Sequence, residues 1–143
     1  MRVFSGSNVF LRYLAGDGEA RRLVDRVEAG EWSGYVNDVV VSEVVYGYLR
    51  LVLDVSRYEL RRYVVEHVDE VGGLLEQDVL PLFTVFSSLP CHVGASMLME
   101  YMVEYKLLPN DALIAATCRV HDVRAIATFD DDFRRVPWLR LFP

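Results

Sequence analysis

Several features that define common protein classes are scarce or absent in this chain of 143 residues. No apolar run reaches the roughly 18 residues that a membrane-spanning helix needs, and no apolar stretch after a basic start suggests a signal peptide. The only two cysteines, Cys91 and Cys118, fit neither a disulfide framework nor a zinc motif. We therefore expect a cytoplasmic protein with reduced thiols.

Motifs for several kinds of chemistry are missing too. The histidines are scattered, no His-x-x-x-His or Cys-x-x-Cys pair offers a zinc site, and Ser42 has no histidine near it in the sequence. The GSN turn after the first predicted strand lacks the lysine of a phosphate-binding loop. These absences disfavour a zinc enzyme, a serine hydrolase and a P-loop nucleotidase.

Lysine is nearly absent as well, because Lys106 is the only one and arginine supplies the other positive side chains. The net charge of −6 argues against a basic protein that coats nucleic acid. It does not exclude a nuclease, since a metal site concentrates carboxylates and local arginines can still hold phosphates. A composition bias of the genome explains the arginines equally well.

The residues that are present predict one globular α/β domain over 1–143, with 52% hydrophobic and 25% charged residues. Short apolar strands alternate with helices, which is typical of a short central parallel sheet of four to five strands flanked by helices. The predicted strands are 2–5, 32–36, 124–128 and 139–142, with a further short strand near Leu89. The predicted helices are 9–14, 19–29, 39–53, 57–70, 74–88, 92–106 and 110–121, with a helical turn at 131–135. Gly6-Ser7-Asn8 is predicted as a turn, Gly30 and the pair Gly72-Gly73 as helix ends or breaks, and Asn37 or Asp38 and Ser56 as helix caps.

Three acidic residues stand out because of their surroundings. Glu43 lies within VVVSEVVYGYL, in a predicted helix that is otherwise almost entirely apolar. Asp111 lies in the first turn of an apolar helix, within LPNDALIAATC, and Asp130 follows a predicted strand, within IATFDDDF. Each has an ordinary structural explanation: a buried ion pair for Glu43, and capping of a helix or turn for the two aspartates.

Their combination is more informative than any one of them. Ligand groups of α/β sheets lie beyond the carboxyl ends of the strands, and each acid is predicted near a strand end or a helix start. Folding can therefore bring all three to one place, with Asp132 as an auxiliary acid. Carboxylate oxygens suit Mg²⁺ or Mn²⁺ better than zinc. The three consecutive aspartates at 130–132 also repel one another, so a nearby cation would stabilise them.

Four segments resemble, in order and spacing, the motifs of PIN-domain ribonucleases, above all the VapC-type toxins of toxin–antitoxin pairs. These segments are FSGSNVFLRYL, VVSEVVYGYL, LLPNDALIAATC and AIATFDDDF. The resemblance covers nearly the whole chain, although residues 55–90 match only in being helical. It implies a PIN-like fold and an endoribonuclease that uses Mg²⁺ or Mn²⁺ to hydrolyse RNA phosphodiester bonds.

The resemblance also assigns roles to residues at matching positions. Glu43, Asp111 and Asp130 match the second, third and fourth catalytic acids that bind the metal, and Asp132 lies close by. In the family, polar residues support these acids, and the residues at the matching positions of this chain are Ser7, Asn8 and Thr128.

The first acid of the family is missing, because Gly6 stands in its place. Asp17 is the nearest acid, but it lies beyond the following predicted helix and is not expected to substitute. Losing an acid that binds the metal should weaken metal binding, so we expect weak or no nuclease activity. Two origins of Gly6 stay open: a substitution made to silence a toxic enzyme, or a natural member of the family that lost the acid.

Other functions remain open alongside the nuclease. Gly6 favours a non-catalytic PIN-fold module that binds RNA or protein. A carboxylate phosphatase or a flap-type DNA nuclease uses similar acids, and the motifs do not distinguish RNA from DNA.

The resemblance further implies three partners: an RNA substrate, an antitoxin protein and a second copy of the chain in a homodimer. Six large residues in the helical stretch 39–65 are predicted to be exposed: Tyr46, Tyr48, Leu49, Leu51, Tyr58 and Tyr63. They could form an interface with a partner, or they could be an ordinary helix stripe that faces the core. Arg57, Arg61 and Arg62 form a basic cluster that could contact RNA or a partner, or could simply be a solvated helix face.

Overall fold

Five parallel strands form the centre of the computed structural model, which describes residues 1–143, in the order β3-β2-β1-β4-β5. The strands are β1 (Arg2–Ser5), β2 (Ser33–Val36), β3 (Ser87–Ser88), β4 (Ala125–Ala127) and β5 (Arg140–Phe142). The predicted α/β class, with a short parallel sheet of four to five strands, is confirmed. The short strand predicted near Leu89 is β3.

The middle strands are the most buried, as expected for a parallel sheet covered on both faces. Val3 and Phe4 of β1 are fully buried, and all three residues of β4 are buried. Gly34 of β2 allows helix and sheet to approach closely, because a Cβ there would lie 2.7 Å from side-chain atoms of both Val27 and Phe86. The sheet therefore supplies a rigid base from which polar residues can project at its ends.

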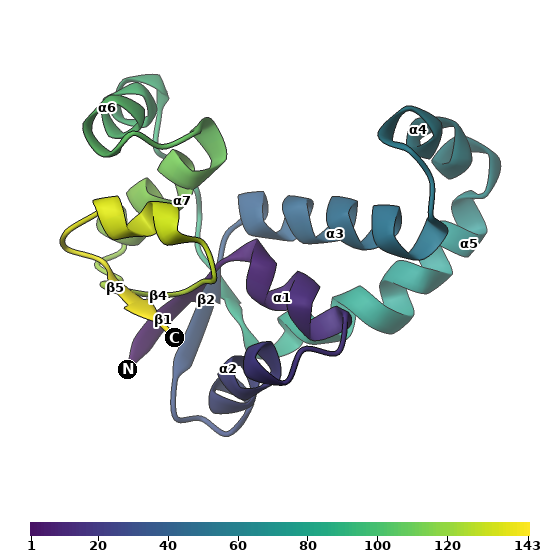
Figure 1. Cartoon of the computed structure of the whole chain (residues 1–143), viewed down its shortest axis with the longest axis horizontal. Helices are drawn as coiled ribbons and strands as arrows, with labels where there is room; N and C mark the ends of the chain where they lie inside the picture. The colour runs from purple at the N-terminus through teal and green to yellow at the C-terminus, as the bar shows by residue number, and fades with distance from the viewer.

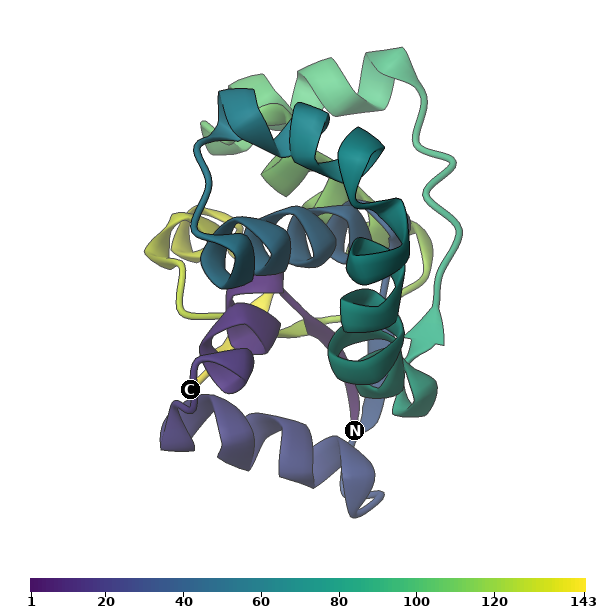
Figure 2. The same cartoon turned by 90° about the vertical axis from the view of Figure 1, so that its right-hand side faces the viewer.

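Helices cover this sheet and extend beyond it. They are α1 (Ser7–Leu14), α2 (Gly18–Glu28), α3 (Asp38–Leu53), α4 (Arg57–Glu66), α5 (Val68–Leu74), α6 (Ala95–Tyr105) and α7 (Pro109–Val120). In Figure 1, α1 and α2 lie to the right of the strands, while α6 and α7 lie above them. Figure 2 shows α3 running between α1 on one side and α4 and α6 on the other. None of these helices is both long enough and apolar enough to cross a lipid bilayer.

The strand order reverses at β1, which gives the sheet a topological switch point. From β1 the chain moves through β2 to β3 on one side, whereas β4 and β5 lie on the other side. Figure 1 shows β1 rising from the N-terminus to the start of α1. Ligands of open parallel sheets bind beyond the carboxyl ends of the strands at such a point. The residues that follow β1 and β4 are therefore placed side by side where a site is expected.

The helix caps follow the sequence in most places. Asn37 accepts a hydrogen bond from Val40 N at 3.1 Å and so begins α3, and Ser56 begins α4 with a complete capping box. Gly30, with a φ of 76°, follows α2 as predicted. The turn predicted at 6–8 is shorter than expected, because α1 already begins at Ser7.

The break predicted at Gly72-Gly73 is wrong. Both glycines lie inside α5, and the chain leaves the helical conformation at His67 instead, where φ is −130° and ψ is 39°. Val71, next to the glycine pair, is buried in the core. Packing of this segment outweighs the unfavourable helix propensity of glycine, which costs only about 1 kcal/mol per residue.

The helix predicted over 74–88 is only partly correct. A π-helical turn, η1 (Leu75–Val79), leads into a 3₁₀ helix, η2 (Leu80–Val85). Tyr48 of α3 donates a hydrogen bond to Asp78 Oδ2 at 2.5 Å, which ties the π-helical turn to α3. Tyr48 and its neighbour Leu49 are buried rather than exposed, so they belong to the core stripe.

Candidate metal centre

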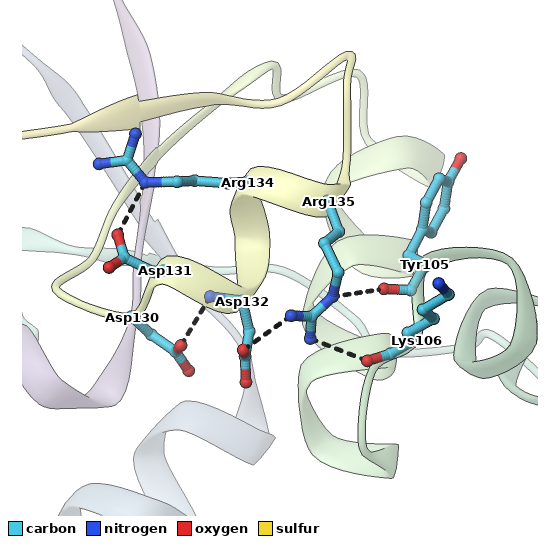
Figure 3. A network of polar contacts seen from close by, with 7 residues as sticks. All are labelled: Tyr105, Lys106, Asp130, Asp131, Asp132, Arg134 and Arg135. Atoms are coloured by element: carbon cyan, nitrogen blue, oxygen red, sulfur yellow. Dashed lines mark hydrogen bonds and ion pairs between the residues drawn. The ribbon is translucent and has the colours of Figure 1, made fainter.

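Three consecutive aspartates follow β4 and point in two directions. In Figure 3, Asp130 and Asp132 point to the same side of the 3₁₀ helix η3 (Asp131–Arg135), while Asp131 turns towards Arg134. Asp130 Oδ1 accepts a hydrogen bond from Asp132 N at 2.9 Å and so caps this short helix. Asp131 pairs with Arg134 at 2.7 Å. Asp131 is thereby turned away from Asp130 and Asp132, which lessens the repulsion among the three acids.

Asp111 completes the cluster from another element. Pro109 opens α7, and Asp111 lies in the first turn of that helix. Asp111, Asp130 and Asp132 each offer a carboxylate oxygen, and these oxygens all lie within 4.8 Å of one another. The three side chains are partly buried. Folding therefore brings together acids that are up to 21 positions apart, counted from Asp111 to Asp132.

Glu43 lies at the edge of this cluster. It is partly buried in α3 and lines a hollow of about 400 Å³ together with Asp111. Its charge is close enough to raise the pKa of Asp111. It is not among the three residues whose carboxylate oxygens converge within 4.8 Å. Glu43 thus shares the site but stands further from its centre than the aspartates.

The pKa of Asp111 reports the electrostatics of the site. Partial burial raises this pKa to about 6, with further contributions from the negative charges of Asp130, Glu43 and Asp132, while Arg135 lowers it. Burial and like charges both disfavour the ionised carboxylate. A divalent cation bound among these oxygens would remove the repulsion.

Asn8 and Thr128 hold the backbone that carries the acids. Asn8 Oδ1 accepts from Phe129 N at 3.1 Å, and Thr128 Oγ1 accepts from Asp130 N at 3.0 Å. Asn8 Nδ2 also donates to Thr128 Oγ1 at 3.4 Å. These bonds connect the start of α1 to the end of β4 across the switch point. Ser7 makes no side-chain hydrogen bond and instead lines a second hollow beside Glu43.

Gly6 lies at the switch point, and its backbone conformation does not require glycine. Its φ of −74° and ψ of 160° are open to any L-residue. Its N–H donates to Ala127 O at 2.9 Å, and a Cβ built there would lie 3.4 Å from Thr128 Oγ1, which is an ordinary contact. The backbone and the immediate surroundings of position 6 therefore accept the Cβ of a larger residue beside Thr128.

Asp17 is engaged elsewhere. Its side chain caps α2 by accepting from Glu19 N and Ala20 N, and it forms an ion pair with Arg12. The backbone hydrogen bond from Glu19 is the main cause that lowers its pKa. A residue with these partners is not available to replace a missing acid at position 6.

Arg135 belongs to the site but was not identified from the sequence. It donates to Asp132 Oδ1 at 3.0 Å, and to the carbonyl oxygens of Tyr105 at 3.0 Å and Lys106 at 2.8 Å (Figure 3). One guanidinium therefore connects the C-terminal end of α6 to an acid of the cluster. The spacing Asp-x-x-Arg, which is favourable on a helical turn, was the available signal.

The donor set fits a hard divalent cation. All of the converging atoms are carboxylate oxygens, and no histidine or cysteine takes part. Mg²⁺ and Mn²⁺ prefer such ligands, whereas zinc sites are dominated by nitrogen and sulfur. Asp111, Asp130 and Asp132 would hold the ion, with Glu43 beside them.

Comparison with known proteins identifies the family of this chain. The family model described as "PIN domain" matches residues 6–139. The chain belongs to the PIN-domain family. A curated relative, Ribonuclease VapC2 from Methanocaldococcus jannaschii, is 34% identical over 98% of this chain and 92% of its own length. Ribonuclease VapC6 from the same organism is 27% identical over 97% of this chain and 95% of its own length. Within the family, the chain belongs to the VapC-type branch.

Solved structures show the same fold. This PIN domain superposes on a chain of the VapBC2 crystal structure from Rickettsia felis, which is bound to a promoter DNA fragment, with a TM-score of 0.64 and 16% identity, over 99% of this chain and 98% of the other. FitAcB from Neisseria gonorrhoeae gives a TM-score of 0.64 and 21% identity, over 100% and 97% of the two chains. These likenesses show that the fold is shared over nearly the whole chain.

Proposed function

We propose that this PIN domain is a metal-dependent endoribonuclease of VapC type that hydrolyses RNA phosphodiester bonds and is impaired by Gly6. The convergence of Asp111, Asp130 and Asp132 within 4.8 Å carries the proposal. The relatives named ribonuclease, which match nearly the whole chain, support the choice of RNA.

The residues of the site would perform distinct tasks in this reaction. Asp111, Asp130 and Asp132 would hold Mg²⁺ or Mn²⁺, while Asn8 and Thr128 keep the loop after β4 in place. A bound divalent ion would lower the pKa of a water nucleophile and neutralise charge on the phosphate. Glu43, which lines a hollow with Asp111, would accept a proton or add an oxygen ligand to the ion.

Gly6 explains why we expect this activity to be weak. The position faces Thr128, next to Asp130, and the family's first acid would stand there. Without that carboxylate, a bound ion would have one negative ligand fewer. Gly6 also favours the alternative proposal, a PIN-fold module that binds RNA or protein without cleavage.

Restoring the acid tests both proposals. We expect Gly6→Asp to tighten Mn²⁺ binding by about 10–100-fold and to produce metal-dependent RNA cleavage, because a side chain at this position meets no steric clash at its Cβ and would add a negative oxygen ligand. Calorimetric titration with MnCl₂ and a cleavage assay on single-stranded RNA measure the two effects. Gly6→Asn is the matched control, since it has the same shape without the charge and should restore little.

Each possible result has a definite meaning. If Gly6→Asp binds Mn²⁺ no better than the unmodified chain, the assignment of the metal site is wrong. If Gly6→Asp binds Mn²⁺ tightly but leaves RNA intact, the binding-module alternative replaces the nuclease.

We also propose an antitoxin protein as a partner, assembly as a homodimer and a cytoplasmic location. The similar structures are complexes named VapBC2, FitAcB and FitAB, which supports an antitoxin. Free Cys91 and Cys118 suit a reducing compartment.

A further inference from the structure

Tyr46 differs from every other tyrosine in the chain. It is 46% exposed on α3, and it takes part in no side-chain hydrogen bond, ring pair or guanidinium contact. The chain has 8 tyrosines, and each of the others has at least one such partner: Tyr13, Tyr35, Tyr48, Tyr58, Tyr63, Tyr101 and Tyr105. Both the ring and the hydroxyl group of Tyr46 are thus free to bind something else.

The position of Tyr46 links it to the acidic site. Tyr46 and Glu43 are three residues apart on α3 and therefore lie on the same helix face. Tyr46 lines a hollow of about 460 Å³, whereas Asp111 lines the hollow of about 400 Å³ described above. Glu43 and Asn110 line both hollows, so the two meet at these residues. A linear polymer bound at the acids can therefore continue into the hollow that Tyr46 lines.

The chemistry of the Tyr46 hollow selects a neutral, planar and polar group. Apart from Tyr46 and Glu43, its walls are small, polar or aliphatic: Ser7, Leu11, Ser42, Gly47 and Asn110. No arginine or lysine lines it, so nothing there would attract a phosphate, and Glu43 would repel one. The hydroxyl groups of Ser7 and Ser42 and the amide of Asn110 offer both donors and acceptors. An exposed aromatic ring beside such groups is the usual platform for stacking a nucleobase.

We infer that this hollow is a nucleobase subsite, in which Tyr46 stacks on the base of a nucleotide adjoining the phosphate at the acids. The inference rests on the proposed function, because it takes single-stranded RNA as the substrate. Asn110 and Ser42 would contact the edge of the base, and Tyr46 would contact its face. The subsite would make cleavage depend on an unpaired base at one defined position.

Kinetics in the Gly6→Asp background test the subsite. We expect Tyr46→Leu to raise KM for single-stranded RNA by roughly 5- to 150-fold, the range that corresponds to losing one base–aromatic stack. We expect kcat to change much less, and Tyr46→Phe to retain most of the affinity because the ring remains. Tyr58→Leu is the control, since Tyr58 is 80% exposed but lines neither hollow. The same substitutions should also be made in the chain that keeps Gly6. There, fluorescence anisotropy should show that Tyr46→Leu lowers the affinity for RNA more than Tyr46→Phe or Tyr58→Leu does.

Abasic substitutions in the RNA provide a test that does not depend on the stability of a variant. One abasic position should weaken binding to the chain with Tyr46, and the same position should have little further effect with Tyr46→Leu. Equal KM values for Tyr46 and Tyr46→Leu, in an enzyme that does cleave RNA, overturn the subsite while leaving the nuclease proposal intact. If Gly6→Asp neither binds nor cleaves RNA, both the subsite and the nuclease fail.

Discussion

The pKa of Asp111 depends on its burial and on the negative charges of the site. Its pKa is raised from 3.8 to about 6, first by burial and then by Asp130, Glu43 and Asp132. Between these two pH values the folded protein binds more protons at this group than the unfolded chain does. The stability of the metal-free protein therefore falls as the pH rises from about 4 through 6, because the ionised carboxylate is disfavoured in the fold.

Asp111→Asn should remove this effect. In EDTA at pH 7.5 we expect the variant to melt a few degrees above the unmodified chain, and at pH 4.5 the difference should shrink. The stabilisation by MnCl₂ should be lost in the same variant. Calorimetric melting at the two pH values, with EDTA or MnCl₂, measures all of this. Asp131→Asn is the control, because Asp131 is exposed and pairs with Arg134; a matching response from that variant would contradict the role of Asp111.

At the scale of elements, the end of α6 and the 3₁₀ helix η3 are joined by one arginine. Arg135 bonds to two carbonyl oxygens at the C-terminal end of α6 and to Asp132 in η3. Lys106, which ends α6, adopts a left-handed conformation with a φ of 55°, so the carbonyl groups there lack helical partners. The planar guanidinium of Arg135 donates to both of these carbonyl groups at once.

We expect Arg135→Gln to lower the free energy of unfolding by about 1–2 kcal/mol, since charge-assisted hydrogen bonds are lost at a partly exposed position. Arg134→Gln should change it by less than about 0.5 kcal/mol, because Arg134 pairs only with exposed Asp131. Urea denaturation of the two variants gives the comparison. Equal losses would show that Arg135 does not hold α6 to the site.

Across the whole molecule, the acidic balance raises the question of where RNA phosphates would be held. The net charge is −6, and the basic cluster Arg57, Arg61 and Arg62 lies on α4, beyond the far end of α3 from Glu43. Arg62 already pairs with Glu66 at 2.8 Å. Charges of both signs alternate along this helix, which favours a solvated face over a phosphate-binding surface.

The double variant Arg61→Ala, Arg62→Ala should therefore leave RNA binding nearly unchanged. We expect the slope of log affinity against log salt concentration to stay the same, because no phosphate contact is removed. Fluorescence anisotropy with single-stranded RNA at several salt concentrations measures the slope. A slope that becomes shallower by about 0.7 or more for each arginine would place the RNA backbone on α4.

Much of the fold and of the candidate site follows from local patterns in the sequence. Short apolar strands alternating with capped helices predicted the parallel sheet, and the caps at Asn37 and Ser56 are decided by neighbouring residues alone. Glu43 and Asp111 could be selected because each lies in an otherwise apolar helix, and Asp130 because it directly follows an apolar strand. Gly6 could be recognised as unusual because its neighbours match a known motif.

Only the tertiary structure decided the features that depend on residues far apart in the chain. Packing kept Gly72 and Gly73 helical and buried Tyr48, although local preference indicated a break and an exposed face. The raised pKa of Asp111, the bridge made by Arg135 and the hollow beside Tyr46 all depend on residues of other elements. Helix caps and strand patterns act over a few residues, whereas burial and electrostatic repulsion depend on distances that exist only after folding.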